Sequence, residues 1–578
     1  MSIKSLFFKK KKLEKPWEKY YTEEELNFKI PNVTMYDTVV ESTKKFPNNI
    51  AYRYFSKKVK YKKMLKQINK CSKAFNYFGI KKGDIVTICS PNIPQALISV
   101  YALNKLGAIA HMIHPLSAEE EIKDSVNDTK SKLLLIIDID YEKLKNVIDS
   151  TNLEYVVMLC AADSMNLFMH LGYNLTKKRK YKRYPHRKPY MSWNKFMRKS
   201  FKSKNIKLPY LDKNTPAVIL HSGGTSGKPK YVVINNRSFY VSAIQTGSIA
   251  LKKIKPGDST LAIMPNFHGF GLSVCMHTPL TLGCTTILIP QFDSKKFDVL
   301  MNKTKPSIVL GVPTLFEALI NSKNIKNLDL SYLKYIVSGG DSLSKSLEEK
   351  FNKYLKEHNA NINVVQGYGL SEGLAAVALC FDDKYKPGSI GIPLARNSIK
   401  IIDPATREVV PYGQIGEICV NGPSVMIGYL NNESETNDAL QMHDDAKVWL
   451  HTGDMGHMDE DGFLFYDQRM KRMIVTSGYN VYPSHIEDVI EKHPDVLQCT
   501  VVGMKHPYKM EVPKAFIVLK DGKNANIFKK IAIKEYCKKN LVHYMCPYKY
   551  VFRKALPKTK LGKIDFRSLQ DDNGDDDV

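Results

Sequence analysis

The sequence predicts an α/β protein with a large N-terminal domain, in which mostly parallel sheets are layered with helices, and a small α+β domain at the C-terminus. Three features of the pattern support this fold class. From Met35 onward, short apolar runs alternate with amphipathic helical segments, which is typical of parallel strands joined by crossover helices. From about residue 398 the segments become β-rich and punctuated by glycine, which predicts a β-rich subdomain. The last hundred residues, from Tyr482, indicate a smaller α+β unit.

The expected elements follow one another in a regular order along the chain. In the first half, the period of the apolar residues predicts a helix followed by a strand over 37–52, helices over 61–80, 94–108 and 119–131, and strands over 84–90, 110–115 and 132–138. The same alternation of helices and strands resumes later, with strands expected over 260–265, 285–290, 306–313 and 335–340. The β-rich part contains strands over 398–404, 417–422, 463–468 and 473–478.

Changes in charge and in the pattern of predicted helices and strands suggest that the chain has four segments. A polar Arg469–Arg472 stretch lies between two hydrophobic strands, so we expect a domain boundary there. The predicted segments are a basic N-terminal arm (1–30), an N-terminal domain (31–470, with the β-rich subdomain at about 398–470), a C-terminal domain (472–568) and an acidic tail (569–578).

Composition narrows the class of protein. The 578 residues carry a formal net charge of +28, and ten cysteines show no metal-ligand spacing, which is typical of reduced core thiols. The apolar stretches are too short to span a bilayer, since that requires about 20 residues. We therefore expect a cytoplasmic protein, with peripheral membrane association as an open alternative.

One local patch is strongly basic. No acidic residue occurs between Ser164 and Leu211, and the patch includes TKKRKYKRYPHRKPY at 176–190, after an apolar run at 165–175. A solvated loop explains this patch, and contact of 176–207 with an anionic membrane is the sharper hypothesis. We expect no nucleic acid, because no nucleic-acid-binding motif accompanies the patch.

The stretch from Leu220 to Lys230 carries the clearest chemistry. An apolar run (217–220) leads into it and a β-branched run (231–234) follows it, which predicts a strand, a tight loop and a second strand. The stretch contains three glycines, three hydroxyl residues and two lysines. Successive backbone N–H groups, hydroxyls and ammonium groups together form a cradle for a polyphosphate. The spacing is not that of a Walker A loop, because Gly223 to Gly227 is one residue short and Pro229 replaces the metal-binding hydroxyl. A glycine-rich β-turn on a basic surface remains the alternative for this loop taken alone.

Further motifs follow this loop in a fixed order. They are VVQGYGLSEG (364–373), WLHTGDMG (449–456), DQRMKRMIVTSGYNVYP (467–483) and PKTKLGKI (557–564), with support from PNFHGFGL (265–272), SGGDSLS (338–344), KPGSIGIP (386–393) and GEICVNGPSVMIGY (416–429). Together with HSGGTSGKPK (221–230), this set resembles the adenylate-forming acyl-CoA synthetase family. The resemblance implies that ATP and a carboxylic acid give an acyl-adenylate, which CoA then converts to a thioester. It also implies Mg²⁺ as a cofactor and a mobile C-terminal domain.

The resemblance assigns roles to residues that match the motifs. The implied catalytic residues are Lys563, His268 and Glu372, with Glu372 and Thr225 at the metal. The implied ATP- and AMP-binding residues are Ser222, Gly223, Gly224, Thr225, Ser226, Gly227, Lys230, Gly339, Gly340, Gly367, Tyr368, Gly369, Ser371, Asp454 and Arg469. Asp454 and Arg469 would bind the ribose, and Tyr368 would stack on adenine. The implied hinge is Lys471, the CoA-binding residues are Gly478 and Tyr479, and the acyl pocket is formed by Phe267, Gly269, Phe270 and Gly271.

Several positions depart from the family pattern. His221 and Tyr231 flank the loop where the family has other residues, and Arg472 replaces an acidic residue after the hinge. None of them removes a group with an assigned chemical role, so an active enzyme is expected.

The identity of the substrate stays open. No aspartate occurs near Phe267 to hold an α-amino group, which argues against amino-acid activation. A medium- or long-chain fatty acid is the leading substrate, and an aromatic acid is the alternative. Loading of a carrier protein instead of CoA, or ATP binding by a basic membrane protein without ligation, are further alternatives. The oligomeric state is also open.

Overall fold

The fold is described from a computed structural model of the chain, in which residues 14–144, 147–176, 184–203, 207–222, 229–381, 384–476, 479–520, 522–523, 525–558, 564–570 and 572 are described. The chain packs as two compact units. Unit 1 comprises Met1–Ser398 and Val420–Leu450, and unit 2 comprises Ile399–Cys419 and His451–Val578. The predicted boundary at 469–472 stays a prediction.

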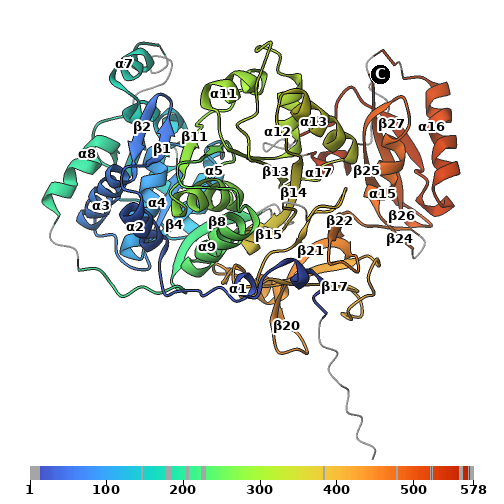
Figure 1. Cartoon of the computed structure of the whole chain (residues 1–578), viewed down its shortest axis with the longest axis horizontal. Coiled ribbons are helices and arrows are strands. Elements are labelled where there is room, and N and C mark those ends of the chain that lie inside the picture. Colours follow the sequence, from blue (N-terminus) through green and yellow to red (C-terminus); the bar gives the residue numbers. More distant parts are fainter. Residues whose placement is uncertain are drawn as a thin grey trace, which may run out of the picture. The chain divides into compact units, whose positions relative to one another are not determined.

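Unit 1 contains a nine-stranded sheet with the order β16-β15-β14-β13-β12-β10-β11-β1-β2 (Figure 1). Neighbours from β14 to β1 run parallel, and antiparallel strands close both edges. The strands are β1 (Ile50–Tyr54), β2 (Lys57–Lys60), β10 (Ser259–Ala262), β11 (Thr285–Leu288), β12 (Ile308–Gly311), β13 (Tyr335–Gly339), β14 (Val364–Leu370), β15 (Ala375–Leu379) and β16 (Ile392–Pro393).

A second sheet of unit 1 has eight strands in the order β19-β9-β8-β4-β3-β5-β6-β7. Its strands from β8 to β7 are parallel, whereas β9 pairs antiparallel with both β8 and β19. The strands are β3 (Ile85–Cys89), β4 (Ile109–Ile113), β5 (Leu133–Ile137), β6 (Val156–Leu159), β7 (Tyr190–Ser192), β8 (Pro216–Ser222), β9 (Lys230–Asn235) and β19 (Gly428–Tyr429).

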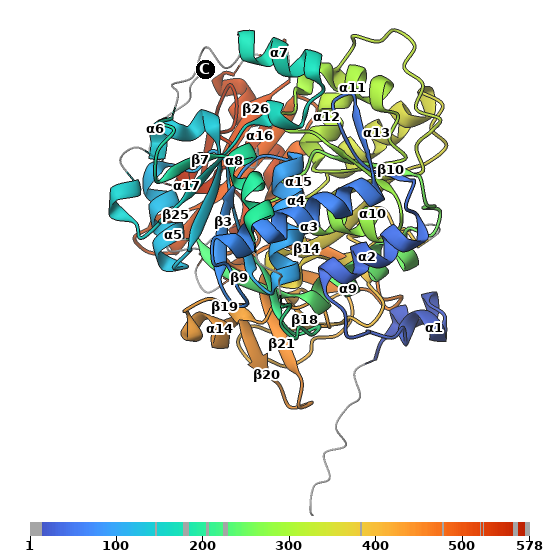
Figure 2. The same cartoon turned by 90° about the vertical axis from the view of Figure 1, so that its left-hand side faces the viewer.

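Helices cover these sheets, and α2, α3 and α4 lie side by side (Figure 2). Nearly every residue of α4 is buried, in keeping with its apolar composition. Phe297, Phe316 and Phe351, from three other helices, fill a core beneath the nine-stranded sheet. The helices of unit 1 are α1 (Glu23–Leu26), α2 (Met35–Lys45), α3 (Tyr61–Tyr77), α4 (Pro94–Leu106), α5 (Glu119–Asp128), α6 (Tyr141–Leu144), α7 (Leu167–Thr176), α8 (Trp193–Arg198), α9 (Asn236–Ala243), α10 (Thr278–Thr281), α11 (Phe297–Thr304), α12 (Pro313–Asn321), α13 (Lys345–Glu357) and α14 (Glu433–Ala439).

A β-rich part of the chain carries β17 (Ser398–Ile402), β18 (Gly416–Asn421), β21 (Val448–Met458) and β22 (Leu464–Arg469). In unit 2, β21 pairs antiparallel with β22. In unit 1, the first residues of β21 pair with β20 (Leu440–Met442).

The C-terminal part of unit 2 is an α+β sandwich. Its sheet has the order β24-β23-β26-β25, with β27 beside β26. Its core contains Ile486, Ile490 and Ile533 from the covering helices. The elements are β23 (Ile474–Thr476), β24 (Tyr479–Val481), β25 (Val496–His506), β26 (Met510–Leu519), β27 (Lys549–Phe552), α15 (Pro483–Glu491), α16 (Ile527–Asn540) and α17 (Phe566–Gln570).

The predicted fold class is confirmed, and each segment expected to be a helix or strand contains that element. All ten cysteines are free, and nine of them are buried, as expected of core thiols. Within the described ranges, no helix is both long and apolar enough to cross a bilayer.

Candidate functional site

The glycine-rich loop connects two antiparallel strands, as the sequence predicts. β8 ends at Ser222 and β9 begins at Lys230, and these two residues are paired across the hairpin. The hydroxyl of Ser222 is buried and makes no hydrogen bond to any described residue. A buried hydroxyl without a partner is costly, so it suits a group that donates to a ligand. Gly223, Gly224, Thr225, Ser226 and Gly227 lie outside the described residues.

Lys230 and Glu372 are connected through one aromatic side chain. The Lys230 ammonium lies 4.8 Å from the centre of the Tyr429 ring, and the Tyr429 hydroxyl donates a 2.9 Å hydrogen bond to Glu372 Oε1. Lys230 also forms an ion pair with Glu435. A short strand positions Tyr429, because β19 pairs with β9 and places Tyr429 opposite Val232. A cation and a carboxylate are therefore held together at the base of the loop.

Glu372 lies in a single turn (Ser371–Gly373) between β14 and β15. The backbone after it is unusual, because Leu374 and Ala375 have positive φ angles of 52° and 78°. Such angles are uncommon for residues with a side chain and are concentrated at functional sites. The Ser371 hydroxyl donates to the carbonyl of His221 at 3.4 Å, which ties this turn to β8. The turn with these unusual φ angles thus lies beside the hairpin formed by β8 and β9.

A pair of histidines, the buried His111 and the partly buried His221, supports that hairpin. His111 Nε2 and His221 Nε2 are 2.8 Å apart, and His111 Nδ1 is 3.0 Å from the Thr87 hydroxyl. Burial lowers the pKa of His111 well below its ordinary value and that of His221 to about 4. Tyr231, opposite His221, donates to Asp128 at 2.8 Å. Both departures from the family pattern therefore form side-chain contacts next to the ends of the loop, the partly buried pair of His221 with His111 and the exposed hydrogen bond of Tyr231 with Asp128.

The predicted nucleotide-binding glycines cluster where β13 and β14 end. Gly339 is paired with Gly367, and Gly340 has a φ of 78° that favours glycine. Gly369 lies so close to β15 that a Cβ would overlap the Ala375 carbonyl oxygen. Tyr368, between the last two glycines of β14, is buried.

The predicted acyl-pocket residues lead into a π-helical segment, Phe270–His277. π-Helical turns are rare and are frequent at functional sites. Phe267 contacts both His268 and His114, with ring centroids 4.8 and 4.4 Å apart. At Gly271 a Cβ would overlap the carbonyl oxygens of Met264 and Pro265, so this glycine permits close packing of the preceding turn.

The predicted ribose-binding residues of unit 2 lie opposite each other. Asp454 on β21 is paired with Arg469 on β22, and Asp454 Oδ1 lies 2.9 Å from Arg469 Nε. The Asp454 side chain is 3% exposed and that of Arg469 is 56% exposed, so the carboxylate is buried whereas the arginine side chain is largely open to solvent. A carboxylate held in this way can accept hydrogen bonds from two ribose hydroxyls.

The segment after Arg469 is anchored to the rest of unit 2. Lys471, the predicted hinge, is exposed. Arg472 pairs with Glu487 at 2.5 Å and stacks over the Phe566 ring at 3.7 Å from its centre. Because Phe566 follows Lys563 by three residues, Arg472 connects the hinge to the segment that carries the predicted catalytic lysine. Lys563 and Gly478 lie outside the described residues, and only the backbone of Tyr479 is described.

Sequence reasoning missed four residues of this arrangement. Tyr429 and Glu435 both contact Lys230. Glu417 accepts a hydrogen bond from the backbone N–H of Gly453, which precedes Asp454, and His451 pairs with Glu417. Tyr429, Glu417 and His451 fall inside the quoted motifs, but nothing in the local pattern shows which distant strand they face.

Comparison with known proteins finds relatives that match nearly the whole chain. Residues 39–430 match the model of the AMP-binding enzyme family, and residues 485–563 match that of the AMP-binding enzyme C-terminal domain. A long-chain-fatty-acid–CoA ligase from Bacillus subtilis (strain 168) is 30% identical over 559 residues, covering 96% of this chain and 98% of the relative. A probable 4-coumarate–CoA ligase 1 from Dictyostelium discoideum is 29% identical over 519 residues, covering 88% and 89%.

Solved structures share the fold. That of the anthranilate CoA ligase AuaEII, in complex with anthranoyl-AMP, has a TM-score of 0.79 at 23% identity and covers 93% of this chain and 96% of that one. The similarity extends over both the larger and the smaller part of the chain.

Proposed function

The chain belongs to the AMP-binding enzyme family and is an AMP-forming acid–thiol ligase, and from this premise we propose that it joins a long-chain fatty acid to CoA. In the first step a carboxylate oxygen attacks the α-phosphorus of ATP, and the bond to the β-phosphate breaks to release pyrophosphate. In the second step the CoA sulfur attacks the acyl carbon, the bond to AMP breaks, and the thiol proton is released.

One observation carries the assignment of the adenylation site: Lys230, Tyr429 and Glu372 are connected at the base of a hairpin loop that is rich in glycine and hydroxyl residues. Forming the adenylate brings an anion to an already anionic nucleotide, so catalysis depends on neutralising and aligning charge. Lys230 and Ser222 are positioned to hold the β- and γ-phosphates. Glu372 and Thr225 would hold Mg²⁺, which would supply additional positive charge, since a carboxylate and a hydroxyl are donors that suit this ion.

The remaining residues orient the other parts of the substrates. Asp454 and Arg469 hold the ribose, and Tyr368 with Gly339, Gly340, Gly367 and Gly369 forms the adenine side. Lys563 contacts the α-phosphate and the carboxylate during adenylation, with His268 near that carboxylate. Rotation at Lys471 then withdraws Lys563 and brings the segment of Gly478 and Tyr479 to CoA.

The acyl substrate is proposed from two kinds of support. The predicted acyl-pocket stretch combines the aromatic residues Phe267 and Phe270 with Gly269 and Gly271, and this combination of aromatic and small residues suits an apolar chain. The relative from Bacillus subtilis is named for long-chain fatty acids. The relative from Dictyostelium discoideum is named for 4-coumarate, an aromatic acid, so an aromatic acid is the second candidate.

A screen of carboxylic acids for pyrophosphate release, with and without CoA, tests this function. We expect release that depends on a long-chain fatty acid, with an acyl-CoA product that appears only when CoA is present. Pyrophosphate release that occurs with aromatic acids but not with fatty acids would favour the second candidate. Release without any CoA product, in the presence of CoA, would instead indicate a carrier protein as the acceptor.

We also propose a peripheral contact with an anionic membrane. Helix α7 lies at the periphery of unit 1 (Figure 1) and exposes 85% of Phe168, 51% of Leu171 and 60% of Leu175. The basic segment 176–190 follows directly. Exposed apolar residues followed by clustered lysine and arginine suit a lipid surface of negative charge, where a fatty acid substrate also partitions.

A further inference from the structure

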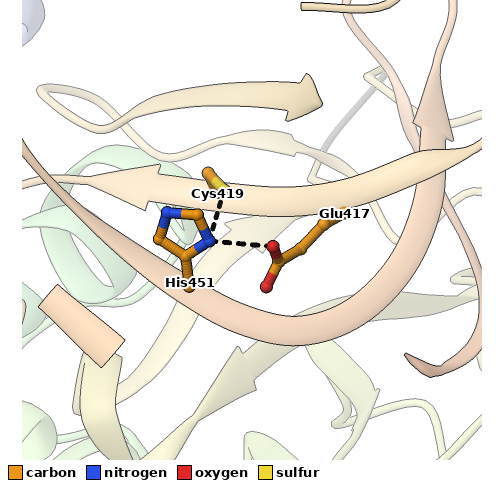
Figure 3. A group of neighbouring side chains, drawn as sticks. All are labelled: Glu417, Cys419 and His451. Atoms are coloured by element: carbon orange, nitrogen blue, oxygen red, sulfur yellow. Dashed lines mark hydrogen bonds and ion pairs between the residues drawn. The ribbon is translucent and has the colours of Figure 1, made fainter. Parts of the chain in front are cut away.

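A buried pair of side chains lies beneath the Thr452–Gly453–Asp454 turn. Glu417 on β18 and His451 on β21 point toward each other (Figure 3), and His451 Nδ1 lies 2.8 Å from Glu417 Oε2. Their side chains are 7% and 11% exposed, respectively. The other carboxylate oxygen, Oε1, accepts a 3.0 Å hydrogen bond from the backbone N–H of Gly453. Both oxygens of one carboxylate are thus used within the turn that leads to Asp454.

The turn needs such support because its backbone is unusual. Gly453 has a φ of 67°, in the left-handed region that favours glycine. The Thr452 hydroxyl donates to the Ile418 carbonyl at 2.7 Å and accepts from the Asp454 N–H at 3.1 Å. Together with Glu417, these bonds fix the backbone on both sides of Gly453. The direction of the Asp454 carboxylate follows from that backbone.

We propose that Glu417 and His451 are positioning residues that aim Asp454 at the ribose of ATP. His451 orients the Glu417 carboxylate, Glu417 holds the Gly453 N–H, and this bond sets where Asp454 can accept hydrogen bonds. The inference rests on the proposed ribose-binding role of Asp454. Neither residue touches the nucleotide in this scheme, and both act through the turn.

Cys419 makes a metal ion the competing explanation. Its sulfur lies 3.7 Å from His451 Nδ1, and the donor atoms of Glu417, Cys419 and His451 lie within 4.8 Å of one another (Figure 3). Glutamate, cysteine and histidine together can bind zinc. However, His451 Nδ1 and both carboxylate oxygens already have hydrogen-bond partners, and burial raises the pKa of the Cys419 thiol, which opposes formation of the thiolate. The geometry therefore favours a hydrogen-bonded pair.

Discrimination between ATP and its deoxy analogues tests the proposal. For the full-length enzyme, kcat/KM is measured with ATP, 2′-deoxyATP and 3′-deoxyATP by pyrophosphate release. We expect the wild type to prefer ATP by about tenfold or more, since an unpaired buried acceptor is costly, and Asp454→Ala to lose this preference. Glu417→Ala and His451→Ala should lose most of it as well, mainly through a higher KM for ATP, because Glu417→Ala removes the acceptor of the Gly453 N–H. His451→Asn, which places an amide N–H near the position of Nδ1, should recover part of it.

The controls separate the possible failures. Cys419→Ala keeps both hydrogen bonds of Glu417 and should retain the wild-type preference, and the zinc content of the purified wild type should be negligible. If the wild type and Asp454→Ala discriminate equally, the ribose role of Asp454 is wrong. If Asp454→Ala loses the preference while folded Glu417→Ala and His451→Ala keep it, the positioning role alone is overturned. Stoichiometric zinc that is lost in Cys419→Ala would overturn it in favour of a metal site.

Discussion

The hydroxyl of Tyr429 donates a hydrogen bond of 2.9 Å to the carboxylate of Glu372, although the two residues belong to strands and turns far apart in sequence. The backbone reinforces this contact, because the Met426 N–H donates to the Glu372 carbonyl at 2.7 Å. Glu372 is the proposed magnesium ligand, and Tyr429 also lies under the ammonium of Lys230. Tyr429 therefore contacts the proposed metal ligand and the proposed phosphate-binding lysine at the same time.

Replacing Tyr429 by phenylalanine removes only the hydroxyl. We expect the Mg²⁺ concentration for half-maximal adenylation to rise by about three- to tenfold, because one hydrogen bond to a charged group is lost. Glu372→Gln should have a larger effect. The measurement is pyrophosphate release as a function of Mg²⁺ at fixed ATP. Tyr231→Phe is the matched control, since its hydroxyl contacts Asp128 instead. An equal response to Mg²⁺ in Tyr429→Phe and wild type would contradict the proposed role.

Neutralising Glu435 should strengthen ATP binding. Its carboxylate pairs with Lys230, and the side chains are 33% and 25% exposed, respectively. ATP phosphates must compete with this carboxylate, so Glu435→Gln should lower the KM for ATP by about two- to fivefold, which is the range of a partly exposed ion pair. Glu433→Gln, on the same helix α14, controls for the change in net charge. An effect of the same size in both variants would show that general charge, and not the pair with Lys230, is responsible.

Local patterns were sufficient to predict much of the fold, but long-range contacts were not predictable. The strand–loop–strand arrangement around Ser222 and Lys230 follows from apolar and β-branched runs on either side of glycines. The contact of Tyr429 with Lys230 depends on the pairing of β19 with β9, which joins segments nearly two hundred residues apart. No periodicity records such a pairing.

The same limit applies to backbone conformation and buried networks. The positive φ of Leu374 and Ala375 is imposed by tertiary packing, since neither residue favours it locally. The partnership of Glu417 with His451 requires the adjacent strands β18 and β21. The motifs were sufficient to predict which segments form the site. The contacts that support these segments could be identified only from the fold.

Lys563→Ala should separate the two half-reactions. We expect carboxylate-dependent pyrophosphate release to fall by at least about a hundredfold, because a full charge beside the α-phosphate is lost. Thioester formation from supplied acyl-adenylate and CoA should be retained, since the proposed rotation withdraws Lys563 before that step. Lys558→Ala, on an exposed residue nearby, is the control for loss of a lysine. Comparable losses in both half-reactions would argue against the assignment.

The histidine pair beneath the loop should make folding stability depend on pH. Burial lowers the pKa of His221 to about 4, below the value near 6.5 of an unfolded histidine. Between these values the unfolded chain binds more protons, so the free energy of unfolding falls as the pH decreases from about 6.5 toward 4. At about pH 5 the expected loss is roughly 2 kcal/mol from His221.

Urea unfolding at about pH 7.5 and pH 5 measures this dependence. His221→Thr should show a smaller loss of stability on acidification than the wild type, whereas His186→Thr, at an exposed position, should match the wild type. Identical pH dependence in His221→Thr and wild type would contradict a neutral buried His221.

The proposed membrane contact predicts different roles for apolar and basic residues. In a sedimentation assay with vesicles of about one-third anionic lipid, the wild type should pellet, and pelleting should decrease at high salt because surface charges are screened. Phe168→Ser combined with Leu171→Ser should weaken binding by about tenfold or more, since burial of apolar side chains is lost. Lys/Arg→Ala changes across 177–188 should abolish the preference for anionic over neutral lipid.

Phe528→Ser, at an exposed phenylalanine of α16, controls for loss of a surface aromatic residue. Because neither set of changes touches the proposed site, adenylation of a water-soluble acid should be unchanged in both variants. Unaltered pelleting in both variants would show that α7 and the basic segment do not bind the membrane.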